Sequence, residues 1–249
     1  MNSNTIIRSA LAITLSTACL FGQAVAPVQA TKAPRPPKTP IMISPELLNS
    51  VALITPPPAL DSKKMSKEIA EIYAIHRSAT PQETEKANWD NKHENIWAIG
   101  MVLGSQFTPE ALPATAALWA DVDNDQSIVV SAAKKFFQHS RPYDLDANIH
   151  SVCGSKPGGA KNSYPSGHGT VGYLSALLLS GMVPEKQDAI RIRAEEYAHS
   201  RVVCGDHYAA DLAASKEAAE LIMGNLLANA RFQTEFAAAR SEVRKALGL

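Results

Sequence analysis

The sequence is poor in the features that build β-sheets, dense disulfide frameworks and membrane spans. It has three cysteines among 249 residues, and aromatic residues make up 6%. Runs of alternating β-branched and polar residues are missing, whereas the periodic segments are rich in alanine, leucine and glutamate, which favour helices. The longest apolar stretch after residue 30, residues 171–183, is shorter than the roughly 20 residues that cross a bilayer. These absences predict an all-α protein that does not span a membrane.

An excess of charge of either sign is also missing. The chain carries 24 lysines and arginines against 24 aspartates and glutamates. Proteins that bind nucleic acid usually show a basic excess, so this balance argues against a nucleic-acid partner. Any site for an anion must therefore be a local cluster of cations.

The first 30 residues have a composition unlike the rest. Arg8 is their only charged residue, an apolar run covers residues 10–21, and Val28-Gln29-Ala30 has the small-x-small form that a signal peptidase cleaves. The apolar run is too short to remain as a membrane anchor. We expect residues 1–30 to be a cleaved signal peptide that directs export. The remaining 219 residues are enough for one domain with a well-buried core.

Two cysteines, Cys153 and Cys204, remain after that cleavage. An even number of cysteines in an exported protein suggests a disulfide. A bridge that closes a loop of about 50 residues would stabilise the fold by roughly 4 kcal/mol. Two buried free thiols are the alternative interpretation.

Proline content and helical periodicity divide the rest of the chain into an arm and one helical domain. Residues 31–44 form a proline-rich N-terminal arm, and residues 45–249 form a single domain. Apolar spacing and capping residues predict its helices. The expected helices cover residues 45–51, 62–75, 81–103, 109–120, 128–138, 166–182, 184–203, 207–230 and 234–247, with a turn at the acidic run 121–125 and an irregular stretch at 140–164.

One segment, Pro165-Ser166-Gly167-His168, precedes a long apolar helical run. Ser166 is suited to cap that helix, and Gly167 lets the backbone approach a ligand closely. Free amides and the helix dipole favour an anion at this end of a helix. We expect His168 to project toward that anion.

A second segment follows the next predicted helix. Gly205 is a plausible helix stop, and Asp206 can cap the following helix, which would place His207 in its first turn. His207 and Asp211 are four residues apart, so a helix puts them on one face. A carboxylate that accepts from one imidazole nitrogen leaves the other free to attack. Arg201, just before the turn, can direct its guanidinium at phosphate oxygens.

A third segment adds two more cations. Lys134 lies near a helix end, and Arg141 lies in the extended stretch that Pro142 imposes. Three cations with two histidines suit phosphoryl transfer, in which one histidine attacks phosphorus and the other protonates the leaving group. The cations neutralise the developing charge, so this chemistry needs no metal.

These spacings resemble the tripartite signature of the type-2 phosphatidic acid phosphatase superfamily. Within it, the exported class A bacterial non-specific acid phosphatases are most similar. The resemblance covers nearly all of the chain after residue 30. It is carried by Lys134-x6-Arg141-Pro142, Pro165-Ser166-Gly167-His168 and Ser200-Arg201-x5-His207-x3-Asp211, and also by Pro56-Pro57-Pro58-Ala59-Leu60, Asn162-Ser163-Tyr164 and Val203-Cys204-Gly205.

The resemblance implies that His207 is the nucleophile, that His168 is the general acid and that Asp211 is the partner of His207. The phosphate contacts would be Lys134, Arg141, Ser166, Gly167, His168 and Arg201. Lys134 is preferred over the adjacent Lys135 because its spacing matches the family, and we expect Lys135 to be solvated.

For the whole protein, the resemblance implies a compact multi-helix bundle of the acid phosphatase and vanadium haloperoxidase type. Members of the family commonly form homo-oligomers, work without metal or other cofactor at mildly acid pH, and lie in the periplasm. The implied activity is hydrolysis of small phosphate monoesters with broad specificity through a phosphohistidine. Inorganic phosphate is the product, and phosphotransfer is a side activity.

Two positions depart from the family pattern. Gly169 stands where threonine is frequent, and Asp206 stands where an uncharged residue is more common. We expect the acidic Asp206 to raise the pKa of the adjacent His207.

Three alternative functions stay open. They are a vanadate-dependent haloperoxidase, a lipid phosphatase and a non-catalytic periplasmic phosphate-binding protein. The remaining histidines lack a convincing partner and are expected to be structural or exposed: His76, His93, His139, His150 and His199.

No metal site is expected elsewhere in the chain. His93-Glu94 lacks the second histidine of a zinc-binding helix. Asp121, Asp123 and Asp125 fit the first positions of a calcium loop. However, Gln126 and Ala132 stand where that loop needs glycine and glutamate.

Overall fold

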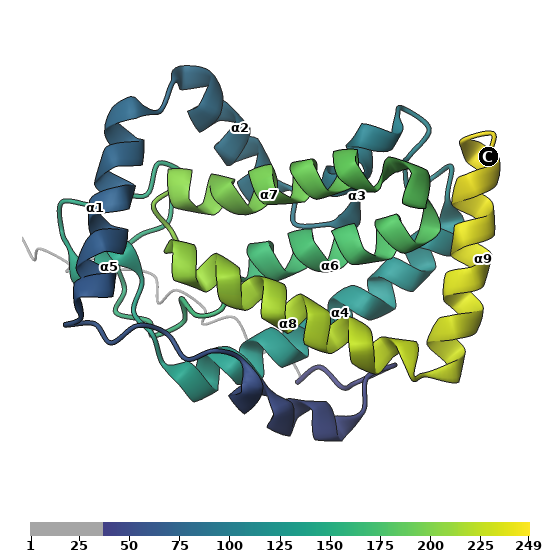
Figure 1. Ribbon diagram of the computed structural model, residues 1–249, viewed down its shortest axis with the longest axis horizontal. Helices are drawn as coiled ribbons and strands as arrows, with labels where there is room; N and C mark the ends of the chain where they lie inside the picture. Colours follow the sequence, from purple (N-terminus) through teal and green to yellow (C-terminus); the bar gives the residue numbers. More distant parts are fainter. Residues whose placement is uncertain (1–36) are drawn as a thin grey trace, which may run out of the picture. The chain divides into compact units, whose positions relative to one another are not determined.

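Helices are the regular structure of residues 37–249, which are the residues that the computed structural model describes (Figure 1). The prediction of an all-α protein is therefore confirmed. The expected signal peptide and residues 31–36 of the arm lie outside the described residues. The elements are η1 (Pro45–Leu53), α1 (Lys63–Ser78), α2 (Pro81–Lys92), α3 (Ile96–Gly100), η2 (Met101–Leu103), α4 (Pro113–Phe137), α5 (Pro142–Leu145), α6 (Gly167–Met182), η3 (Pro184–Lys186), α7 (Gln187–Val203), α8 (Ala209–Leu227) and α9 (Ala230–Ala246).

The core surrounds α6, which has α7 along one side and α8 along the other (Figure 1). Val171, Leu174 and Leu178 of α6 are fully buried, as expected for a helix that is apolar on most of its circumference. At Gly172, an added Cβ would lie 2.8 Å from the ring of Tyr197, so the absent side chain lets α7 pack closely against α6. No helix within residues 37–249 is long and apolar enough to cross a membrane.

One 25-residue helix, α4, replaces the two helices and the acidic turn that the sequence predicted. The acidic residues face partners from distant parts of the chain instead of breaking the helix. Asp121 pairs with Arg231 of α9, and Asp125 is fully buried. The helix also starts at Pro113 rather than Pro109. Its first amides, those of Ala114 and Thr115, donate to the Glu242 carboxylate of α9 at 3.0 and 2.9 Å.

The helix predicted over residues 81–103 is divided into α2, α3 and η2. Asn95 interrupts it, because its side chain caps α3 by accepting from the Ala98 amide at 3.1 Å. Between α2 and α3 the chain turns, and His93 leaves helical geometry, with its carbonyl accepting from the Tyr197 hydroxyl at 3.0 Å. The last helix, α9, begins at Ala230 rather than at Thr234, because Asn229 caps it.

The turn between α7 and α8 differs from the prediction by two residues. Gly205 ends α7 in the left-handed region, with φ +73°, where a glycine is favoured. The prediction that Asp206 caps α8 and that His207 lies in its first turn is wrong. Tyr208 is the N-cap residue, and its amide donates to Asp211 at 3.1 Å. His207 therefore lies in the turn itself.

A disulfide joins Cys153 to Cys204, which excludes the alternative of two free thiols. The bridge links the irregular stretch before α6 to the end of α7. The Val152 amide adds a hydrogen bond of 3.0 Å to the Cys204 carbonyl. The loop and the α7–α8 turn are thus held together by covalent and hydrogen bonds.

Candidate active site

The termini of several helices meet at a pocket of about 440 Å³. It lies at the N-terminus of α6, beside the last turns of α4 and α7. The structure brings together residues from all three predicted segments. Six of them line the pocket: Lys134, Arg141, Gly167, His168, Arg201 and His207.

His207 is held in one tautomer by partners on both ring nitrogens. Its Nδ1 lies 2.9 Å from Oδ2 of Asp211, and its Nε2 lies 3.2 Å from a guanidinium nitrogen of Arg141. Arginine can only donate, so Nε2 must be the acceptor and Nδ1 must carry the proton. The lone pair of Nε2 therefore points toward Arg141, which lines the pocket together with His207.

Asp211 is fully buried behind His207, and all of its hydrogen bonds converge on Oδ2. The Ser163 hydroxyl donates to this atom at 2.5 Å, in addition to His207 and the Tyr208 amide. Burial raises the pKa of Asp211, and the donors Ser163 and Tyr208 oppose that rise. With three donors, Oδ2 is fixed as an acceptor and the His207 ring is fixed with it.

The pKa of His207 is lowered well below its ordinary value by burial, and next by Arg141 and Arg201. The expectation that Asp206 raises this pKa is wrong. The Asp206 carboxylate accepts from the Arg201 guanidinium at 2.6 Å and from the Ser155 hydroxyl at 3.0 Å, so its charge is compensated by the arginine. A neutral imidazole beside cations is the form that can act as a nucleophile in acid.

The two arginines are fixed by neighbours that leave donors free. Arg201 is 3% exposed, and its terminal nitrogens donate to Asn91 and Asp206, whereas its Nε is buried without a partner. Arg141 donates through Nε to the Asn162 side chain at 2.8 Å. Burial, followed by Arg141, lowers the pKa of Lys134 to about 8, so this lysine still carries its charge at acid pH. Lys135 is exposed, as expected.

The start of α6 has the form that the sequence predicted. Ser166 caps the helix by accepting from the Gly169 amide at 3.2 Å; it is fully buried and lies behind the pocket lining. An added Cβ at Gly167 would lie 3.3 Å from Glu94 and 4.0 Å from Lys134, so any side chain there would enter the pocket. His168 places Nε2 at 3.1 Å from the Asn91 carbonyl and Nδ1 at 3.3 Å from Oε1 of Glu94.

The sequence of the chain is similar to those of known phosphatases. The family model of the PAP2 superfamily matches residues 124–235. Non-specific acid phosphatases of Salmonella typhimurium and Salmonella typhi are 33% and 31% identical over 210 residues, which is 80% of this chain and 81% of each relative. The non-specific acid phosphatase of Providencia stuartii is 29% identical over 210 residues, 80% of this chain and 83% of its own.

The chain belongs to the PAP2 superfamily. It is an acid phosphatase, and its similarity to the non-specific acid phosphatases agrees with the class that the sequence motifs indicated. The matched range of residues 124–235 contains all three segments of the pocket.

The pocket of this PAP2 phosphatase also contains a segment that sequence reasoning missed. Asn91, in the last turn of α2, and Glu94, in the turn between α2 and α3, line it. Asn91 receives hydrogen bonds from both Arg201 and His168. The only sequence signal here was His93-Glu94, which was considered for zinc alone. Within residues 37–249, no group of three or more His, Cys, Asp or Glu side chains is placed to hold a metal ion.

His139 was expected to be structural or exposed, and it is buried close to the reactive pair. Its Nδ1 lies 4.0 Å from Oδ1 of Asp211, and its Nε2 lies 3.3 Å from the Pro58 carbonyl. Burial lowers the pKa of His139. A neutral ring here fills space behind Asp211 without adding charge.

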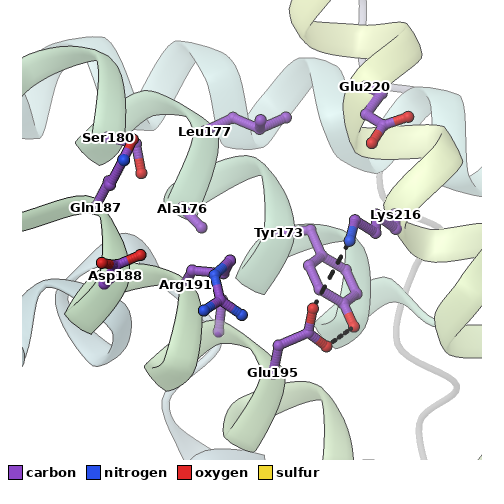
Figure 2. A pocket seen from close by; sticks show the side chains of 11 residues that line it. Tyr173, Ala176, Leu177, Ser180, Gln187, Asp188, Arg191, Glu195, Lys216 and Glu220 are labelled. Atoms are coloured by element: carbon purple, nitrogen blue, oxygen red, sulfur yellow. Dashed lines mark hydrogen bonds and ion pairs between the residues drawn. The ribbon is translucent and has the colours of Figure 1, made fainter. Parts of the chain in front are cut away.

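A second pocket of the acid phosphatase lies between α6, α7 and α8 and has a volume of about 340 Å³ (Figure 2). Three of its polar side chains contact one another. The Tyr173 hydroxyl donates to Glu195 at 2.7 Å, and Lys216 lies 3.7 Å from the same carboxylate. None of the residues in the three motif segments lines it. Residues of all three motif segments line the pocket at the start of α6 instead.

Proposed function

We propose that this acid phosphatase hydrolyses phosphate monoesters of broad specificity, without metal, through a phosphohistidine on His207. One observation carries the proposal. The unprotonated Nε2 of His207 points toward Arg141 in a pocket that Lys134 and Arg201 also line, while Asp211 accepts the proton of its Nδ1.

In the first step, Nε2 of His207 attacks phosphorus and the bond from phosphorus to the ester oxygen breaks. The leaving oxygen takes a proton from His168 and departs as an alcohol. Lys134, Arg141 and Arg201 neutralise the charge on the equatorial oxygens, a role that a metal ion has in other phosphatases. Gly167 gives the phosphate room at the start of α6, where the helix dipole and free amides favour an anion.

In the second step, His168 takes a proton from water, and the resulting oxygen attacks phosphorus. The bond to Nε2 breaks and inorganic phosphate leaves, which restores both histidines. An alcohol that replaces water would yield a new phosphate ester, so phosphotransfer is the expected side activity.

Broad specificity is supported by the shape of the pocket mouth. One wall comes from α5 and the irregular stretch after it, through Tyr143, Ser155, Lys156 and Asn162. Asp144 holds this wall by accepting from the amides of Gly158 and Gly159 at 3.0 and 2.9 Å. The pocket volume of about 440 Å³ exceeds that of a phosphate group and most lining residues are polar, so leaving groups of different shapes fit.

We also propose that the enzyme acts in the periplasm as a homo-oligomer. The expected signal peptide supports export, and the Cys153–Cys204 disulfide fits an oxidising compartment. Cell fractionation and sedimentation of the purified protein test the two statements. Activity confined to the cytoplasm, or a strict monomer, would contradict them.

The mechanism is tested by rapid-quench trapping with a labelled phosphate monoester. We expect acid-labile label on the wild-type chain and none on His207→Ala. The wild type should hydrolyse p-nitrophenyl phosphate with or without a chelator, and His207→Ala should not hydrolyse it in either condition. His199→Ala is the matched control, because His199 is exposed on α7 outside the pocket. Full hydrolysis by His207→Ala would refute the proposed mechanism.

A further inference from the structure

We propose that Glu94 is a positioning residue that holds the catalytic proton on Nδ1 of His168. The inference rests on the proposed function, in which His168 protonates the leaving group. Glu94 belongs to none of the three motif segments. It reaches the site from the turn between α2 and α3, and its Oε1 lies 3.3 Å from Nδ1 of His168.

The two contacts of the His168 ring require that its imidazole and the Glu94 carboxyl group together carry two protons. Nε2 faces the Asn91 carbonyl, which can only accept, so Nε2 carries a proton. In a neutral ring, Nδ1 would then present a lone pair to the lone pairs of a carboxylate. The 3.3 Å contact is favourable only when the pair carries a second proton, either on Nδ1 of His168 or on the Glu94 carboxyl group. The pair therefore stores one proton beside the phosphate site.

The charges around this pair decide which partner holds that proton. Burial and then Arg201 lower the pKa of His168 to about 3, with contributions from Lys134 and Arg141. Burial and then Asp123 raise the pKa of Glu94. Both shifts favour Glu94 over His168 as the holder of the proton in the empty pocket. The charged and titratable groups that face the pair are Lys134 and Asp123 on α4, Arg201 on α7, Arg141 before α5, His207 in the α7–α8 turn and Lys38 in the arm.

A bound phosphate ester changes this balance because its negative charge compensates the same cations. The proton then moves from Oε1 of Glu94 to Nδ1 of His168, where the ionised carboxylate holds it. When the bond from phosphorus to the ester oxygen breaks, the leaving oxygen takes this proton. The imidazole keeps its Nε2 proton on the Asn91 carbonyl.

Glu94 also stands next to the place that phosphate would occupy. An added Cβ at Gly167 would lie 3.3 Å from Oε1, and the Glu94 side chain is 42% exposed. In the empty pocket the shared proton favours Glu94, so the carboxyl group does not repel the incoming anion. Removing this carboxyl group takes away the proton that would pass to His168 when phosphate binds, so it should weaken phosphate binding and lower the pKa of His168 in the complex together.

The test compares Glu94→Gln with wild type and with Glu85→Gln, which removes the same charge from an exposed position of α2 outside the pocket. We expect Glu94→Gln to move the basic limb of the kcat–pH profile by about one pH unit toward acid. Inhibition by inorganic phosphate at pH 6 should weaken about threefold in this variant. Glu94→Asp keeps a carboxyl group, so its basic limb should lie between those of Glu94→Gln and the wild type. Glu85→Gln should match the wild type.

A measurement without turnover separates this inference from the proposed mechanism. The imidazole resonances are titrated in the phosphate-bound protein, and the His168 signal is assigned by its loss in His168→Ala. Its midpoint should move toward acid in Glu94→Gln and stay in place in Glu85→Gln. An unmoved midpoint would overturn the role of Glu94, whether or not the wild type forms a phosphohistidine.

Discussion

Neighbouring residues hold the arginine side chains of the pocket in fixed orientations. Arg141 donates to the Asp206 carbonyl at 3.1 Å and to His207 at 3.2 Å from the same nitrogen. The Asp206 side chain in turn holds Arg201. Both arginines are therefore oriented before phosphate arrives, and orienting them costs nothing during the reaction.

At Gly167 the pocket depends on the absence of a side chain. We expect Gly167→Ala to lower kcat/KM roughly 100-fold, because the added methyl group displaces phosphate from its position beside Lys134 and Glu94. The fold should keep its stability, since alanine suits the first turn of a helix. Steady-state kinetics and urea unfolding measure the two effects.

Gly224 of α8 is the matched control for this substitution. An added Cβ there meets nothing within 4 Å. We expect Gly224→Ala to stabilise the protein by about 0.5–1 kcal/mol and to leave kcat/KM unchanged. Wild-type kinetics in Gly167→Ala would show that phosphate does not approach the start of α6.

At the scale of elements, the disulfide joins two segments that build the pocket. Asn91 donates to the Cys153 carbonyl at 3.3 Å, and Ser155 donates to Asp206. The bridge, the end of α2 and the α7–α8 turn therefore form one connected unit around Arg201.

Replacement of both cysteines by serine should lower the free energy of unfolding by about 4 kcal/mol, because the bridge closes a loop across 51 positions. The hydrogen bonds around Asp206 remain, so kcat at 25 °C should stay within about threefold of wild type. Denaturant unfolding and initial rates test this. Wild type under a reductant should match the variant, and a folded but inactive variant would mean that the bridge itself positions the site.

The sequence predicted elements whose signals are local and missed those that depend on distant partners. Ser166 caps α6, which was expected because a cap acts within three residues. The continuity of α4 was not expected. Its acidic residues looked like a turn, but they bind Arg231 and the backbone of residues 41–43, which only the folded chain brings near.

The candidate site also has one part that the sequence predicted and one part that it did not. The three motif segments were visible because each combines a histidine or arginine with turn and capping residues. Asn91 and Glu94 have no such local signature. Their place in the pocket depends on the packing of α2 against α7, which includes the buried pair of Asp90 and Arg193. Contacts of this kind follow from tertiary structure, and a single sequence does not display them.

At the scale of the whole molecule, the end of the N-terminal arm is part of the fold. Met42 and Ile43 are 2% and 5% exposed, and η1 packs on α4 and α8. The Asp125 carboxylate accepts from the amides of Ile41, Met42 and Ile43 at 2.8, 2.7 and 2.9 Å. A strand partner would satisfy such amides in a sheet protein, and here one buried carboxylate does so.

We expect Asp125→Ala to lower the free energy of unfolding by about 3 kcal/mol, because it leaves three amides without an acceptor. Asp125→Asn keeps one acceptor oxygen, so its loss should be smaller. Hydrogen exchange should quicken at residues 41–43 in both variants. kcat should stay near the wild-type value, since Asp125 does not line the pocket. Unchanged exchange at these amides in Asp125→Ala would show that apolar burial of Met42 and Ile43 holds the arm by itself.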